Sequence, residues 1–181
     1  MVAAMTRRTA LQAMVFTTLL TAGLLPGMGH SARAASLPMP APAASFQTES
    51  GTRSLAGYRG RKVMVWMFST WCSSCAAAFE ALSEKQSALN KAGLNIIALK
   101  NFENGGYPGP SLHEFVKRFG PTLLKEPNWT FGEVPALMAQ AYNPRRYPDI
   151  YFLIDEKGIL QAVQGAPGST MATITRFAGL N

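Results

Sequence analysis

The sequence predicts an α/β protein with a central mixed β-sheet flanked by α-helices. Two observations predict this class. First, an apolar run at 61–68, a helical pattern over 73–92 and a second apolar run at 94–99 form a strand–helix–strand unit, in which the two strands are parallel. Second, the apolar segments 149–155 and 158–165 are joined by the turn D-E-K-G, which is typical of an antiparallel hairpin.

The elements follow from local patterns. The run Arg61–Phe68 is almost continuously apolar, so we expect a strand that is buried on both faces. Apolar side chains then recur at helical spacing over Ser73–Ala92, with Gln86 as the one polar interruption and a glycine directly after. Leu94–Leu99 is the second buried strand.

The second half of the chain is less regular. Ser111 and Glu114 have the spacing of a capping box, which predicts the start of a short helix that Gly120 and Pro121 stop. We expect residues 122–133 to be irregular. A further short helix is predicted over 134–142, and a C-terminal helix over 171–180.

The N-terminus has the pattern of an export signal. A positive pair, Arg7 and Arg8, precedes an uncharged apolar stretch, and the small residues around Ala34 fit a cleavage site. The apolar stretch is short for a transmembrane helix, which needs roughly 20 residues. The stretch T-R-R-T-A-L resembles a twin-arginine signal, although Ala10 stands where a large apolar residue is usual, so Sec export stays open. We expect residues 1–34 to be removed and the protein to be periplasmic.

The remaining chain is long enough for one domain. Residues 35–45 form a Pro/Ala-rich extended linker by composition, and residues 46–181 form the domain. Without residues 1–34 the chain keeps 14 basic and 10 acidic residues, so its net charge falls from +7 to +4. The basic residues are scattered and do not form a stripe with interleaved aromatic residues, which argues against nucleic acid as a partner. We expect a monomer.

The only two cysteines, Cys72 and Cys75, stand two residues apart directly after Trp71. A disulfide that closes so short a loop stabilises a fold little. A closed zinc site needs four ligands, and His113 is the only histidine of the mature chain, so we predict no metal there. A redox pair fits better, because a cysteine at the start of a helix meets the positive end of the helix dipole, which favours the reactive thiolate.

Two segments together resemble a known family. S-L-A-G-Y-R-G-R-K-V-M-V-W-M-F-S-T-W-C-S-S-C is similar to the start of the TlpA/ResA-like thioredoxin-fold family, and A-Q-A-Y-N-P-R-R-Y-P-D-I-Y-F-L-I-D-E-K-G-I-L resembles its second signature. The resemblance covers roughly residues 46–165. It implies a thioredoxin-like fold and a thiol–disulfide oxidoreductase that needs no cofactor beyond its own cysteine pair.

The resemblance also implies roles for single residues. Cys72 matches the attacking cysteine and Cys75 the resolving one. Pro148 matches a cis-proline that lies against the cysteines, with the backbone of Tyr147 free to pair with an extended substrate. Trp71 matches part of an exposed apolar rim; a packed core aromatic is the alternative.

The chain departs from the family at the proton-transfer positions. Trp66 stands where thioredoxins often keep a buried acid, and Ala78 where the ResA subgroup has one. Proton transfer at Cys75 would then depend on water or backbone. The active-site dipeptide is Ser73–Ser74, whose hydroxyl groups can stabilise a thiolate and so raise the redox potential.

We therefore predict a periplasmic enzyme that reduces protein disulfides, with cytochrome c maturation as a destination implied by resemblance alone. Its expected partners are protein thiols and disulfides and a membrane electron donor such as a DsbD- or CcdA-like reductase. Three alternatives remain: a disulfide oxidase or isomerase of the same fold, a copper(I) carrier with Met67 as the nearest further ligand, and a non-catalytic interaction domain.

Overall fold

A computed structural model describes residues 36–180. Within them lie eight strands, β1 (Met39–Pro40), β2 (Ser45–Thr48), β3 (Gly51–Ser54), β4 (Val63–Phe68), β5 (Asn95–Lys100), β6 (Trp129–Glu133), β7 (Asp149–Ile154) and β8 (Ile159–Gly165). The α-helices are α1 (Ser73–Lys91), α2 (Leu112–Phe119), α3 (Ala136–Tyr142) and α4 (Met171–Ala178). Short 3-10 turns are η1 (Leu55–Tyr58), η2 (Phe102–Gly106) and η3 (Pro121–Lys125).

All the strands join one mixed sheet in the order β1-β8-β7-β4-β5-β6-β2-β3. The centre of the sheet is parallel, because β5 runs parallel to both β4 and β6. β7 and β8 form the predicted antiparallel hairpin, and β7 pairs with the other side of β4. The predicted mixed α/β architecture is therefore confirmed.

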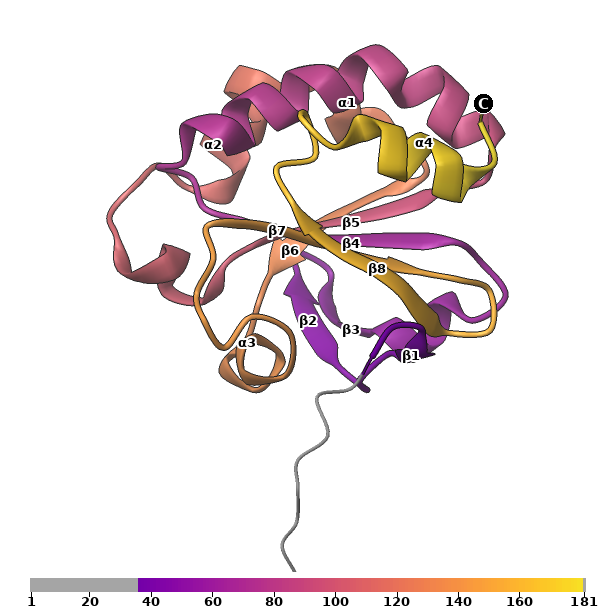
Figure 1. Cartoon of the computed structure of the whole chain (residues 1–181). Coiled ribbons are helices and arrows are strands. Elements are labelled where there is room, and N and C mark those ends of the chain that lie inside the picture. The colour runs from indigo at the N-terminus through magenta and orange to yellow at the C-terminus, as the bar shows by residue number, and fades with distance from the viewer. Residues whose placement is uncertain (1–35, 181) are drawn as a thin grey trace, which may run out of the picture. The chain divides into compact units, whose positions relative to one another are not determined.

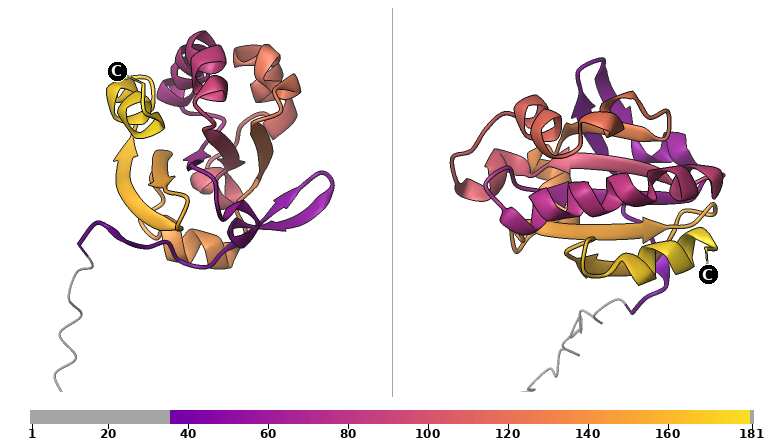
Figure 2. Two further views of the ribbon diagram at one scale, coloured as in Figure 1. Left: turned by 90° about the vertical axis from the view of Figure 1, so that its right-hand side faces the viewer. Right: turned by 90° about the horizontal axis from the view of Figure 1, so that it is seen from above.

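Helices cover the sheet on both sides (Figure 1). α1, α2 and α4 pack on one face, whereas α3 and the N-terminal segment pack on the other, as the edge-on view in Figure 2 shows. β4 alternates between the two cores. Its side chains Met64, Trp66 and Phe68 belong to the core under α1, and the other three belong to the core above α3, so the strand is buried on both faces as predicted.

The α1 core is mainly aromatic. Phe79 of α1 lies at its centre, with ring centroids 4.7 Å from Trp66, 5.0 Å from Phe68 and 5.8 Å from Phe115. Because Phe79 packs against these rings, α1 has a fixed position over the sheet, and so have the cysteines at its start.

The predicted capping box is present on α2, where the side chains of Ser111 and Glu114 each accept a backbone N–H of the other residue.

The expectation that residues 122–133 are irregular is wrong for their last part. Trp129–Glu133 form β6, because Trp129 and Phe131 pack on the aromatic core while the backbone pairs with β5. Gly132 lets β2 approach on the other side, since a Cβ there would overlap the carbonyl oxygen of Gln47. Only Trp129, Thr130 and Phe131 alternate between apolar and polar side chains before Gly132 and Glu133, so the period-two pattern was too short to be recognised in the sequence.

The Pro/Ala-rich segment is extended, as predicted, but part of it belongs to the domain. β1 pairs with β8, the Ala41 N–H donates to the Gly158 carbonyl at 3.0 Å, and the Tyr142 hydroxyl donates to the Pro42 carbonyl at 2.7 Å. The segment therefore adds an edge strand to the sheet. The predicted signal peptide, residues 1–34, lies outside the described residues. Within residues 36–180, no helix has both the length and the apolarity that crossing a bilayer requires.

Candidate functional site

Four segments meet at one end of the sheet: the end of β4, the start of α1, the loop after β5 and the loop before β7 (left in Figure 1). Cys72 is the N-cap residue of α1, with its N–H donating to the Ser69 carbonyl at 3.1 Å and its own carbonyl accepting from Ala76 at 3.2 Å. Cys75 lies in the first turn. Both are free thiols, with Cys72 7% exposed and Cys75 fully buried. The pair therefore lies at the positive end of the α1 dipole.

The buried thiol of Cys75 is held in its protonated form. Its Sγ donates to the carbonyl oxygen of Pro148 at 3.3 Å. Burial raises the pKa of the Cys75 thiol well above its ordinary value, and the nearby charge of Asp149 raises it further. This difference in setting gives the two cysteines different chemistry, since Cys72 lies at the helix end next to the surface.

Asp149 is the acid of the site, and the sequence reasoning missed it. One of its oxygens accepts a hydrogen bond from the Trp66 indole at 2.9 Å, and the other accepts from the Ser74 hydroxyl at 2.7 Å. A carboxylate oxygen of Asp149 and the Sγ atoms of Cys72 and Cys75 all lie within 4.8 Å of one another. Asp149 thus lies near both sulfurs, but the Cys75 thiol itself donates to the Pro148 backbone carbonyl. The expectation that proton transfer at Cys75 depends on water or backbone stays a prediction.

The two serines of the dipeptide have different surroundings. The Ser74 hydroxyl lies 3.1 Å from the Sγ of Cys72 while it donates to Asp149. Ser73 is exposed on the first turn of α1. Because Ser74 has a single proton and donates it to Asp149, it accepts rather than donates at Cys72. The predicted stabilisation of a thiolate by both hydroxyls is absent from this arrangement.

Pro148 lies beside the cysteines, but its peptide bond is not cis. The one cis bond among residues 36–180 is Leu37–Pro38. The loop turns by other means: Arg146 adopts a left-handed backbone at φ 55°, and the Asn143 side chain bonds both the N–H and the carbonyl of Tyr147 at 2.8 Å. This side-chain clamp brings the Pro148 carbonyl to Cys75 and replaces the turn that a cis-proline would make.

The backbone of Tyr147 is also not free to pair with a substrate. Besides the two bonds from Asn143, its carbonyl accepts from the amide of Asn101 at 3.2 Å. Asn101 is buried and donates to the Pro148 carbonyl and the Ser69 hydroxyl as well. The expectation of strand addition at Tyr147 is therefore wrong, because every polar backbone group of that residue already has a partner.

Exposed aromatic side chains border the site. Trp71 is 40% exposed, Tyr147 45% and Tyr107 62%, and the rings of Trp71 and Tyr107 meet edge to face with centroids 4.9 Å apart. The Trp71 indole donates to the carbonyl of Asn104 at 2.7 Å. Trp71 is thus a surface residue, as a rim position requires; its contact with a substrate stays a prediction. Tyr107 lies in a segment whose composition indicated only a loop.

The cluster of two sulfurs and one carboxylate does not fit a metal site. Both oxygens of Asp149 already accept hydrogen bonds, and a hard carboxylate is a poor third donor for a soft ion such as copper(I). Met67 points into the core on the opposite face of the sheet from the cysteines. We therefore assign no residue as a metal ligand.

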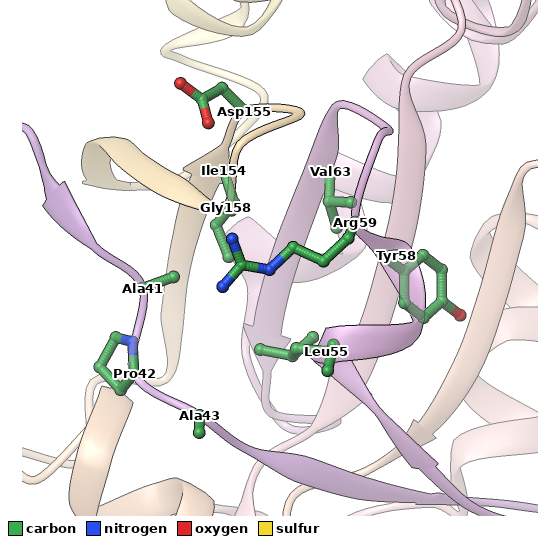
Figure 3. Close-up of a pocket in the computed structure, with 11 residues that line it drawn as sticks. Ala41, Pro42, Ala43, Leu55, Tyr58, Arg59, Val63, Ile154, Asp155 and Gly158 are labelled. Carbon is green, nitrogen blue, oxygen red and sulfur yellow. The ribbon is translucent and has the colours of Figure 1, made fainter.

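A separate cavity of about 90 Å³ lies away from the thiols (Figure 3). It is at the amino end of β4, beside Val63, whereas Cys72 follows the carboxyl end of that strand. The Pro/Ala-rich segment, η1 and the β7–β8 turn line it, and the Arg59 guanidinium reaches across it to the Lys157 carbonyl. Its lining is mostly apolar side chains and backbone, so it is a packing gap between the N-terminal segment and the sheet.

Known proteins resemble this chain in sequence and in structure. A family model described as the AhpC/TSA family matches residues 29–120. The thiol-disulfide oxidoreductase ResA of Geobacillus kaustophilus is 29% identical over 112 residues, which are 60% of this chain and 57% of the relative. The corresponding protein of Geobacillus thermodenitrificans is 32% identical over 69 residues. The chain thus spans little more than half the length of the first relative and 37% of the second.

Solved structures agree on the fold. The thioredoxin domain of a thiol-disulfide oxidoreductase from Bacteroides vulgatus superposes with a TM-score of 0.61 at 18% identity, covering 80% of this chain and 99% of that one. A putative thiol:disulfide interchange protein DsbE from Chlorobium tepidum gives 0.59 at 17% identity, over 78% and 97%. The predicted thioredoxin-like fold and the resemblance to the ResA group are confirmed.

Proposed function

The chain belongs to the AhpC/TSA family, and we propose that it works as a thiol–disulfide oxidoreductase that reduces protein disulfides. One observation carries the proposal: two free thiols in unlike settings, Cys72 at the helix N-terminus and Cys75 buried behind it. The helix dipole favours the thiolate of the outer sulfur, and burial keeps a proton on the inner one. This is the arrangement that two successive exchange reactions need.

The reaction runs through a mixed disulfide. The Cys72 sulfur attacks a substrate disulfide, forms a bond to one substrate sulfur and releases the other as a thiol. Cys75 then loses its proton and attacks the Sγ of Cys72, which releases the second substrate thiol and leaves a Cys72–Cys75 disulfide. Two thiol protons and two electrons pass to the substrate. No cofactor takes part in either step.

The direction of electron flow follows from the charges around the sulfurs. Strong oxidants of this fold have a stabilised reduced form. Here the carboxylate of Asp149 lies beside both sulfurs and the Ser74 proton is used by that carboxylate, so the thiolates gain little stabilisation beyond that of the helix dipole. We expect a potential closer to about −270 mV than to about −120 mV. Equilibration with a glutathione series measures it, and a value near the upper figure would favour the oxidase or isomerase alternative.

The Cys75→Ser variant tests the two-step mechanism. Without the resolving thiol, the mixed disulfide at Cys72 should accumulate during insulin reduction and be visible by mass spectrometry. Cys72→Ser should form no such adduct and serves as the matched control. Copper(I) titration of the reduced protein is the parallel assay for the carrier alternative, which tight binding without insulin reduction would support.

We further propose that the protein acts in the periplasm after removal of residues 1–34, as a monomer fed by a membrane reductase of the DsbD or CcdA type. Thiol exchange needs such a donor because the oxidised pair must be reduced again for each turnover. Mass spectrometry of a periplasmic extract should find a chain that begins near Ala35. An intact N-terminus in the membrane fraction would contradict this. Cytochrome c maturation is one destination for the electrons.

A further inference from the structure

A continuous hydrogen-bonded path runs from the attacking sulfur to a carboxylate. The Sγ of Cys72 lies 3.1 Å from the Ser74 hydroxyl, and that hydroxyl lies 2.7 Å from one oxygen of Asp149. The other oxygen of Asp149 is held by the Trp66 indole at 2.9 Å. The path therefore joins the helix that carries the cysteines to the strand that faces it.

The position of Asp149 is set by the sheet. Asp149 pairs with Phe68 in the register of β7 and β4, so its side chain shares a face with Trp66 and Phe68 and points towards α1. Trp66 stands where related proteins often have a buried acid. Here the indole at that position holds an acid that comes from the neighbouring strand instead.

We propose that Ser74 and Asp149 form a proton relay that takes the proton from Cys72 as its sulfur attacks. Ser74 has one hydroxyl proton, which it donates to Asp149. Towards the Cys72 thiol, the Ser74 oxygen can therefore act only as an acceptor. In the step itself the Cys72 proton passes to the Ser74 oxygen while the Ser74 proton passes to Asp149. The sulfur is left as a thiolate and the carboxylate becomes a carboxylic acid.

The proton returns when the exchange is complete. The sulfur attacks the substrate disulfide, and the departing substrate thiolate takes the proton back from Asp149 through Ser74 or solvent. Asp149 is then again a carboxylate, within 4.8 Å of the Cys75 sulfur, when the resolving step begins. The relay thus neither creates nor consumes protons, and it serves the exchange in both directions.

Other titratable groups face the relay and bear on its pH dependence. From α1 they are the thiols of Cys72 and Cys75. From β7 it is the phenol of Tyr151, whose hydroxyl bonds Gln164 and Thr170. Burial, with a smaller contribution from the charge of Asp149, raises the pKa of Tyr151, so this phenol stays neutral at the pH of the assay.

A simple charge and a relay predict opposite effects of Asp149→Asn. A carboxylate that merely lies near Cys72 disfavours its thiolate, so removing the charge would speed alkylation. A proton acceptor favours the attack, so its removal slows alkylation. We expect Asp149→Asn and Ser74→Ala each to lower the rate of Cys72 alkylation by iodoacetamide by roughly tenfold at mildly acidic pH. This tenfold effect is smaller than the rate enhancement usual for general-base catalysis, because a thiol also loses its proton to water.

The experiment uses the reduced full chain, with Cys75 identified separately by mass spectrometry. Ser74→Thr should restore the rate, because it restores the hydroxyl. The double variant should be no slower than either single variant, because both break one path. Ser83→Ala and Glu80→Gln are matched controls: Ser83 is on the same helix and bonds only the Phe79 carbonyl, and Glu80 is an exposed acid there.

Three results would overturn the relay: an unchanged rate in Ser74→Ala, a faster rate in Asp149→Asn, or additive losses in the double variant. Ser74 is exposed, so its variants test the relay even if Asp149→Asn does not fold. The inference rests on the proposed thiol chemistry, but alkylation needs no protein substrate. A chain that fails to reduce insulin can therefore still pass or fail this test.

Discussion

Asn143 is the residue on which the loop beside the cysteines most depends. Its side chain is buried, accepts from the Tyr147 N–H at 2.8 Å, and donates to the Tyr147 carbonyl at 2.8 Å and to the Asn101 side chain at 3.1 Å. Asn143→Ala removes all three bonds. At about 1 kcal/mol each, the free energy of unfolding should fall by about 3 kcal/mol.

Urea unfolding of the reduced protein measures this loss, with Asn90→Ala as the control because Asn90 is exposed on α1. The control should stay within about 0.5 kcal/mol of the parent. Insulin reduction by Asn143→Ala should also slow, because the loop no longer holds the Pro148 carbonyl at Cys75. A loss of stability below about 1 kcal/mol would refute the idea that this clamp, rather than the proline, fixes the loop.

Three further outcomes are expected. Iodoacetamide should label Cys72 before Cys75, because burial raises the pKa of the Cys75 thiol; peptide mapping that found the reverse order would contradict the assigned roles. Above pH 9.0, the ordinary pKa of a cysteine, the unfolded chain ionises while the buried thiol of Cys75 stays protonated. Between pH 9.0 and pH 10.0 the free energy of unfolding of the reduced protein should therefore fall by up to about 1.4 kcal/mol per pH unit, and Cys75→Ala should remove this slope. Above pH 10.0 the raised pKa values of Tyr142 and Tyr151 add a slope of the same sign. Gln86→Leu should cost about 2–3 kcal/mol in urea unfolding, because it leaves the Trp129 indole without the acceptor it has at 2.6 Å; an unchanged midpoint would show that the buried amide is dispensable.

Much of the framework was predictable from local patterns. The apolar run of β4, the helical spacing of α1 and the capping box at Ser111 depend on residues that are close in sequence, and each was predicted within two residues of its observed bounds. The placement of Cys72 at the start of α1 follows from the same patterns. The strand β6 was missed because its pairing partners and its aromatic contacts come from other parts of the chain.

The Tyr147–Pro148 loop shows where resemblance was insufficient. The sequence places a proline next to the hairpin strand, and the structure brings it to Cys75, but the turn is made by Asn143 and Asn101, which stand four and 46 residues from Tyr147. Asn101 belongs to no motif recognised in the sequence, and Asn143, although it lies within the second family signature, had no role assigned to it. The isomer of the proline bond and the use of the Tyr147 backbone both depend on these side chains.

By itself, then, the sequence determined the order of strands and helices around the cysteines, because hydrophobic periodicity and helix capping are local properties. It also determined that Asp149 begins a strand. Only the tertiary structure decided which face of the sheet that residue joins, because alternation along a strand divides its side chains into two sets without saying which set meets α1. The register of β7 against β4 makes that choice, and it brings Asp149 to Trp66, Ser74 and the two sulfurs.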